Sequence, residues 1–204
     1  MPRIRASSIP EHKALTRRQI LDATRDLIRE SGTADLDLAE LAAIAGIGRT
    51  TLYEYFRDRD DLIASLVEEE LPAVIGQLTS QTTPGGSPDE RLLRLAELTV
   101  EFVATDPVLG LILHREVPRL GTNAQDRIRM AHTDLSASLV GLYVEAVKAG
   151  TYRPVAADIA GRLIHDVTMS AARSAIAAPE RLQEVTANLR QFLHQGFAAQ
   201  PGSR

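Results

Sequence analysis

Apolar residues recur every three or four positions along most of the chain, and no stretch alternates apolar and polar residues for long. The first spacing is typical of helices with one buried face, whereas alternation would indicate strands. Helices are predicted over residues 16–31, 38–45, 49–56, 58–71, 88–105, 107–115, 123–149, 155–177 and 179–197. We therefore expect an all-α protein.

Capping signals define the early helices. Thr16 and Gln19 have the spacing of a capping box, so the first helix is expected to begin there. Asp37 is expected to cap a short second helix that ends at Gly46. A later helix is expected to be kinked or broken at Pro72, because proline lacks a backbone donor.

Two short helices joined by a glycine-containing turn form a helix-turn-helix, whose second helix can enter the major groove of double-stranded DNA. Leu52 and Phe56 are four residues apart and are expected to face the core. Five other positions carry hydroxyl groups or a guanidinium, which suit phosphate oxygens and base edges. These residues are Arg49, Thr50, Thr51, Tyr53 and Tyr55. The helix N-terminus at Gly48 adds backbone N–H groups for an anion.

Charge is unevenly distributed along the chain. The formal net charge of −4 taken alone disfavours nucleic-acid binding. The first 18 residues, however, carry five basic side chains against one acidic side chain. Lys13, Arg17 and Arg18 are near the first helix and are expected to contact DNA. For Arg3 and Arg5 the alternatives are disordered, solvated charge and minor-groove contacts.

From Thr16 to Leu71 the sequence resembles the TetR family of repressors, also called TetR/AcrR. The family's run of a glycine, an apolar residue, small residues, Leu and Tyr matches Gly46 to Tyr53, and Phe56 and Leu62 continue the match. The resemblance implies a sequence-specific transcriptional regulator. The leading hypothesis is a repressor that a small-molecule effector releases from a palindromic operator.

The resemblance assigns roles to single positions. Thr51 and Tyr53 match positions that commonly bind phosphates, although Tyr53 alternatively packs between the first and third helices. Arg49 and Thr50 lie where base edges are commonly read. Tyr55 lies where a phosphate-binding His or Tyr is usual.

Three residues depart from the family pattern. Arg59 replaces a usual Lys and keeps a charge that suits a bidentate phosphate contact. Asp37 replaces a usual Ser or Thr, and its carboxylate would repel phosphate, so it is expected to act only as a cap. Gly48 replaces a usual Ser and removes one hydroxyl contact. The predicted domains are residues 1–57 for DNA binding and 58–204 for ligand binding and dimerisation.

The predicted helix 155–177 carries more apolar surface than one core face can hide, and the helix 179–197 spaces its apolar residues by threes and fours, as in helix–helix packing. The simplest interpretation is a two-fold, four-helix interface in a homodimer; alternatively, both helices belong only to the core. The expected interface residues are Ile159, Leu163, Val167, Leu182, Leu189 and Phe192. A two-fold dimer predicts a palindromic operator, because it presents two equivalent helix-turn-helix units.

The middle helices are expected to enclose the effector. Few aromatic residues remain there to form a cage for a flat cation, which favours an apolar, aliphatic effector. The candidate lining residues are Phe102, His114, His132, Tyr143 and His165. No histidine pair has the i, i+4 spacing of metal ligands and no nucleophile motif is present, so no metal, cofactor or enzyme activity is predicted.

Other classes of protein compete with this hypothesis. A small helical enzyme or ligand carrier would need a catalytic cluster that the sequence lacks. An activator or a nucleoid-type binder without an effector fits the same sequence features as a repressor. The chain has no cysteine, no signal peptide and no apolar run of about 20 residues, so a cytoplasmic protein without a membrane partner is expected.

Overall fold

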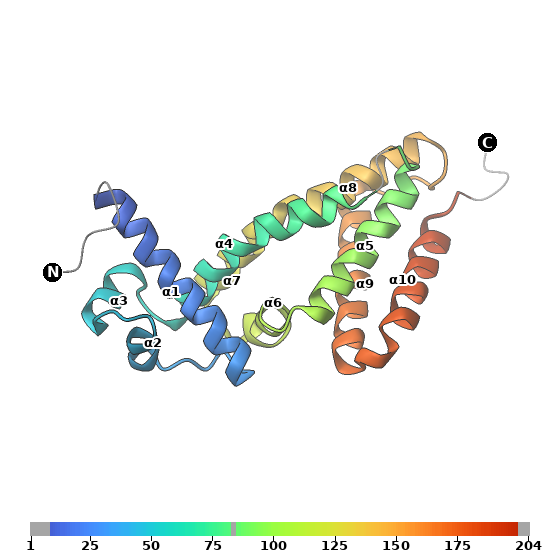
Figure 1. The fold of residues 1–204 in the computed structure, drawn as a ribbon. Coiled ribbons are helices and arrows are strands. Elements are labelled where there is room, and N and C mark those ends of the chain that lie inside the picture. The colour runs from blue at the N-terminus through green and yellow to red at the C-terminus, as the bar shows by residue number, and fades with distance from the viewer. Residues whose placement is uncertain (1–8, 83–84, 200–204) are drawn as a thin grey trace. The chain divides into compact units, whose positions relative to one another are not determined.

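The computed structural model describes residues 9–82 and 85–199 (Figure 1). The α-helices in these ranges are α1 (Ile9–Ser31), α2 (Leu38–Ile44), α3 (Arg49–Tyr55), α4 (Arg59–Ser80), α5 (Pro88–Thr105), α6 (Leu109–Leu111), α7 (Thr122–Ala131), α8 (Thr133–Lys148), α9 (Ala157–Ala177) and α10 (Leu182–Phe197). The shorter turns are the π-helical η1 (Ile112–Glu116) and the 3₁₀ turns η2 (Val117–Arg119) and η3 (Pro179–Arg181). The predicted all-α fold is confirmed.

The chain forms two compact units. The first contains the described residues up to Glu69 together with Leu111–Ile128, and the second contains the other described residues. Helix α4 therefore contributes one half to each unit. The units are defined by compactness, whereas the predicted domains 1–57 and 58–204 are defined by function and stay a prediction.

The core of the first unit forms where the apolar faces of its short helices meet. Helices α2 and α3, with seven residues each, are too short to be stable alone, so packing of an apolar face has to hold them in place. Helices α2 and α3 contact each other, and α1 contacts α2. The side chains that are buried almost completely include Ile20, Ile28, Leu41, Leu52, Phe56 and Leu62.

Helix α1 begins at Ile9, so the start predicted at Thr16 is wrong. The Thr16 hydroxyl lies inside the helix and donates to the backbone oxygen of His12 at 3.0 Å. The Gln19 side chain donates to the backbone oxygen of Ala45 at 2.7 Å. The two residues therefore have the spacing of a capping box but other hydrogen-bond partners.

Three later predictions also differ from the structure. Helix α4 continues through Pro72, which is exposed, so the predicted break is wrong, while the alternative of a kink stays a prediction. The single helix predicted over residues 123–149 is divided at His132 into α7 and α8. The helix predicted over residues 107–115 is replaced by α6 and the π-helical η1.

Helix α5 is the centre of the second unit and packs against α8, α9 and α10 (Figure 1). Its buried side chains include Leu92, Leu95, Ala96 and Val100. Helices α8 and α9 approach closely at Gly161, where a Cβ atom would lie 2.6 Å from Cγ2 of Val140. Within the described residues, no helix has both the length and the apolar character needed to cross a membrane.

Candidate functional site

The turn between α2 and α3 is fixed by backbone conformation and by α1. Gly46 has φ +67°, a left-handed conformation that a side chain disfavours, and it ends α2. The Gln19 side chain binds the backbone oxygen of the preceding Ala45, which ties α1 to this turn. The Asp37 carboxylate accepts a hydrogen bond from the backbone N–H of Ala39 at 2.7 Å, so its predicted role as a cap is confirmed.

Helix α3 separates its apolar and polar side chains. Leu52 and Phe56 are buried, as predicted, and hold the helix against the first unit. Arg49 and Thr50 are exposed, whereas Thr51 and Tyr55 are half-buried. We call the exposed residues of α3 its outward face; they are Arg49, Thr50, Tyr53 and Glu54.

Tyr53 belongs to this outward face, with 44% of its surface exposed, and is not part of the core. The Arg49 guanidinium carbon lies 5.8 Å from the centre of the Tyr53 ring. Interaction with Tyr53 also raises the pKa of Arg49. The Arg49 guanidinium thus packs against the Tyr53 ring on the surface, and both side chains are accessible to a binding partner.

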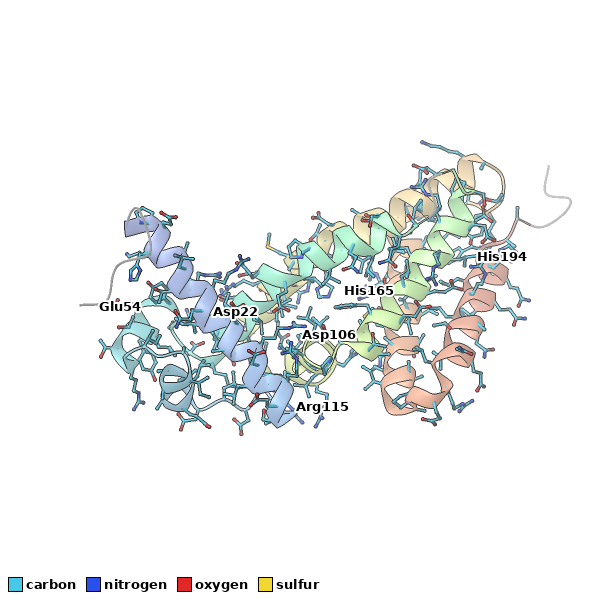
Figure 2. The ribbon with its side chains drawn as sticks, in the orientation of Figure 1. Asp22, Glu54, Asp106, Arg115, His165 and His194 are labelled. Atoms are coloured by element: carbon cyan, nitrogen blue, oxygen red, sulfur yellow. The ribbon has the colours of Figure 1, made fainter. Side chains whose placement is uncertain are left out.

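Glu54 is exposed on α3 and was absent from the predicted contact residues (Figure 2). The signal that identifies it is positional: Glu54 lies two residues from both Leu52 and Phe56, so it faces away from the core. The predicted contact residues of α3 carry hydroxyl or guanidinium groups, whereas Glu54 carries a carboxylate.

The basic residues of α1 differ in their exposure and in their pairing with the Glu69 carboxylate. Lys13 and Arg18 are exposed, but the Arg18 guanidinium lies 3.6 Å from the Glu69 carboxylate. Arg17 pairs with the same carboxylate at 2.9 Å and lies over the Phe56 ring. The positive charge available to DNA is therefore smaller than the sequence suggests. The other two basic residues of this region, Arg3 and Arg5, lie outside the described residues.

Arg59 makes its contacts inside the first unit. Its Nε donates to the backbone oxygen of Ala34 at 2.6 Å, and its Nη2 donates to Oε2 of Glu116 at 2.6 Å. Glu116 is only 6% exposed, so it depends on this partner and on Arg119. Both donating nitrogens are engaged, and the phosphate contact of Arg59 stays a prediction.

Arg127 on α7 makes a second set of contacts with the first half of α4. It binds Glu68 at 2.6 Å and Ser65 at 2.9 Å, and it also pairs with Asp61. The hydrogen bonds with Glu68 raise the pKa of Arg127. These contacts fasten Leu111–Ile128 to α4 within the first unit.

The five candidate effector residues do not all lie in one unit. His114 lies in the first unit, whereas Phe102, His132, Tyr143 and His165 lie in the second; Figure 2 labels His165 on α9. The buried Tyr143 hydroxyl donates to the backbone oxygen of Arg153 at 2.9 Å and accepts from the backbone N–H of Val155 at 2.7 Å. Tyr143 therefore orders the loop before α9, and its effector role stays a prediction. In the described ranges no group of three His, Cys, Asp or Glu side chains is arranged to hold a metal ion.

Helices α9 and α10 expose large apolar side chains. Ile159 is 50% exposed, Leu163 48% and Phe192 63%. We call these three residues the α9–α10 face. A groove of about 760 Å³ lies between the two helices beside them, lined among others by Val167, Leu189 and Phe192. Of the other predicted interface residues, Leu182 is half-buried and Leu189 is buried.

A helix-turn-helix with a polar outward face, followed by a helical second unit, defines a class of DNA-binding transcription regulators. Residues 20–66 match the family described as bacterial regulatory proteins, tetR family, and residues 85–173 match the tetracyclin repressor-like C-terminal domain. The chain belongs to the TetR family of DNA-binding transcription regulators, with a ligand-binding domain after its helix-turn-helix.

Individual relatives can be compared in sequence and in fold. The chain is 23% identical over 132 residues to the fatty acid metabolism regulator protein of Bacillus subtilis (strain 168). This alignment covers 65% of this chain and 68% of that protein. The crystal structure of FadR from Bacillus subtilis in complex with stearoyl-CoA superposes with a TM-score of 0.75 at 19% identity, covering 88% of this chain and 98% of that one. RolR in complex with resorcinol superposes with a TM-score of 0.72 at 19% identity, covering 92% and 90%. At these identities the structural likeness shows the fold.

Proposed function

We propose that this TetR-family regulator is a homodimeric repressor that leaves a palindromic operator when a fatty acyl-CoA binds. The outward face of α3 is the observation that carries the proposal. That face presents hydrogen-bonding groups on a helix of major-groove dimensions, while Leu52 and Phe56 fix its orientation from below.

The α9–α10 face supports the homodimer. Large apolar side chains that stay half exposed in one protomer are stabilised when a second protomer covers them. A two-fold axis through this face would make the same residues meet from both copies. The resulting dimer carries two α3 helices related by symmetry, which requires two inverted half-sites in the operator.

Similarity to a fatty acid metabolism regulator and to a structure that binds stearoyl-CoA supports an acyl-CoA effector. The low aromatic content of this chain, four Phe and four Tyr residues, points in the same direction. An acyl chain needs aliphatic walls, whereas a flat aromatic effector such as resorcinol gains from ring stacking. RolR was crystallised in complex with resorcinol, so resorcinol is the alternative effector to test.

The effector part of the proposal can be tested with DNA selected by the full chain from a random pool. The selected duplex is labelled, and its anisotropy is followed while stearoyl-CoA, CoA, stearate or resorcinol is added. Stearoyl-CoA is expected to weaken binding by about 10- to 100-fold, the usual size of allosteric coupling. Release by resorcinol alone, or by none of the four compounds, would contradict the proposed effector.

A reporter gene tests the sign of regulation. With the selected duplex placed across the promoter, expression of the regulator is expected to lower reporter output, and supplied fatty acid is expected to restore it. Increased output on expression of the regulator would instead identify an activator.

A further inference from the structure

Glu54 occupies the centre of the outward face of α3. An α-helix turns by about 100° per residue, so Glu54 is roughly 160° away from both Leu52 and Phe56. These two side chains are buried and mark the inner side of the helix. Thr50 and Thr51 flank the glutamate, and Arg49 and Tyr53 lie towards one edge. In a helix that lies in the major groove, the position opposite the core points towards the bases.

No hydrogen bond or ion pair joins Glu54 to another residue in the part of the chain that the structure describes. Three other acidic residues of the first unit are engaged: Asp37 caps α2, Glu69 pairs with Arg17, and Glu116 pairs with Arg59. Glu54 is therefore a free carboxylate on a surface that meets a polyanion. Such a group weakens DNA binding unless it finds a donor on the DNA.

The chemistry of a carboxylate limits which base it accepts. An ionised Glu only accepts hydrogen bonds, and in the major groove only the N4 amino group of cytosine and the N6 amino group of adenine donate them. Guanine offers two acceptors, and thymine offers an acceptor and a methyl group. Adenine places the acceptor N7 beside its amino group, where it repels the second carboxylate oxygen. Cytosine carries no acceptor on that side.

We propose that Glu54 is a specificity-determining residue that selects cytosine at one position of each operator half-site. This inference rests on the proposed function, because it needs α3 to enter the major groove. The hydrogen bond from N4 offsets the repulsion between the carboxylate and the phosphates only where cytosine is present. At all other bases the same repulsion remains, so Glu54 discriminates mainly by rejecting wrong sites.

The test compares the operator preferences of the wild type, E54Q and E54A by selection from random DNA, followed by affinities for single-base variants of the selected site. The wild type is expected to require cytosine at one symmetric pair of positions, with a loss of about 10- to 100-fold for other bases. E54Q is expected to change that preference to adenine, because an amide can both donate to N7 and accept from N6. E54A is expected to tolerate every base there. E30Q removes one exposed carboxylate from the end of α1 and is the control for net charge.

Each outcome decides for or against the inference. A preference that changes only at one symmetric pair of positions in E54Q and E54A supports it. If E54Q and E54A bind all sequences more tightly by the same factor, Glu54 acts only through repulsion and the inference is wrong, while the proposed function stands. If the wild type selects no sequence at all, both the inference and the proposed operator are wrong.

Discussion

The outward face of α3 and the α9–α10 face are both exposed helix surfaces, yet they differ in kind. Helix α3 buries Leu52 and leaves hydroxyl, guanidinium and carboxylate groups outside. Helices α9 and α10 leave Ile159, Leu163 and Phe192 exposed. A hydrated, charged partner such as DNA suits the first face, whereas the second gains free energy when another apolar surface covers it. One fold thus displays a polar helix surface and an apolar helix surface, which favour different kinds of partner.

The largest effect is expected from placing a charge on the α9–α10 face. Phe192→Glu puts a carboxylate at the proposed two-fold interface in both copies, so its cost counts twice. Dimerisation and operator affinity should each fall by about 1000-fold, measured by sedimentation and by fluorescence anisotropy. Met130→Glu is the matched control, because Met130 is also exposed and apolar but does not line the groove. A Phe192→Glu variant that remains dimeric would contradict the proposed interface.

The next largest effect tests whether Arg59, the first residue of α4, contacts DNA or serves the interior of the first unit. Arg59→Met leaves Glu116 buried without its main partner and should lower the free energy of unfolding by about 3 kcal/mol in chemical denaturation. Adding Glu116→Leu should restore most of the loss, because the unpaired charge is then gone. The control Arg57→Met removes an exposed pair with Asp58 and should change stability by less than about 0.5 kcal/mol. A stable Arg59→Met variant that binds DNA weakly would show that Arg59 serves phosphate instead.

A smaller effect is expected from removing the guanidinium of the outward face. Arg49→Ala should weaken operator binding by about 10- to 100-fold and non-operator binding by less, so sequence preference relaxes. The same change at Arg29, exposed at the end of α1, is the control and should leave both affinities nearly unchanged. An equal loss on both kinds of DNA would make Arg49 a phosphate contact only.

The smallest effect concerns the cap of α4 and its dependence on pH. The backbone N–H of Asp61 donates to the Asp58 carboxylate at 2.8 Å and lowers the pKa of Asp58. Because the folded pKa is below the unfolded value, this stabilisation is present above roughly pH 4 and is lost as the pH falls through the folded value. Asp58→Ala should therefore cost about 1 kcal/mol at neutral pH and less in acid, as measured by denaturation at several pH values. A cost that is independent of pH would show that the charge of Asp58 contributes nothing.

Local sequence signals were sufficient for much of the first unit. The glycine turn at Gly46, the cap at Asp37 and the buried pair Leu52 and Phe56 each depend on neighbours within a few residues. Where local signals have two meanings, prediction was wrong. Thr16 and Gln19 have capping-box spacing, but inside a helix a threonine also satisfies its hydroxyl on the preceding turn.

The site was less predictable because its remaining contacts join distant segments. The partner of Arg59 is Glu116, and the partners of Arg127 are on α4, and no local pattern indicates such pairs. The division of the predicted helix at His132 carries no glycine or proline signal. Glu54 is different, since its position opposite Leu52 and Phe56 was predictable from local spacing, but the predicted α3 contacts were limited to hydroxyl and guanidinium groups.

The contacts between Leu111–Ile128 and α4 limit how DNA-binding segments can be exchanged between members of this family in engineered chimaeras. The compact first unit is discontinuous in sequence, so a transplanted N-terminal segment arrives without the partners of Arg59, Asp61 and Glu68. A chimaera that keeps the recipient's version of Leu111–Ile128 therefore leaves these three half-buried charges without their matching partners. Transferring the DNA specificity of this chain to a relative therefore requires moving the N-terminal segment and Leu111–Ile128 together.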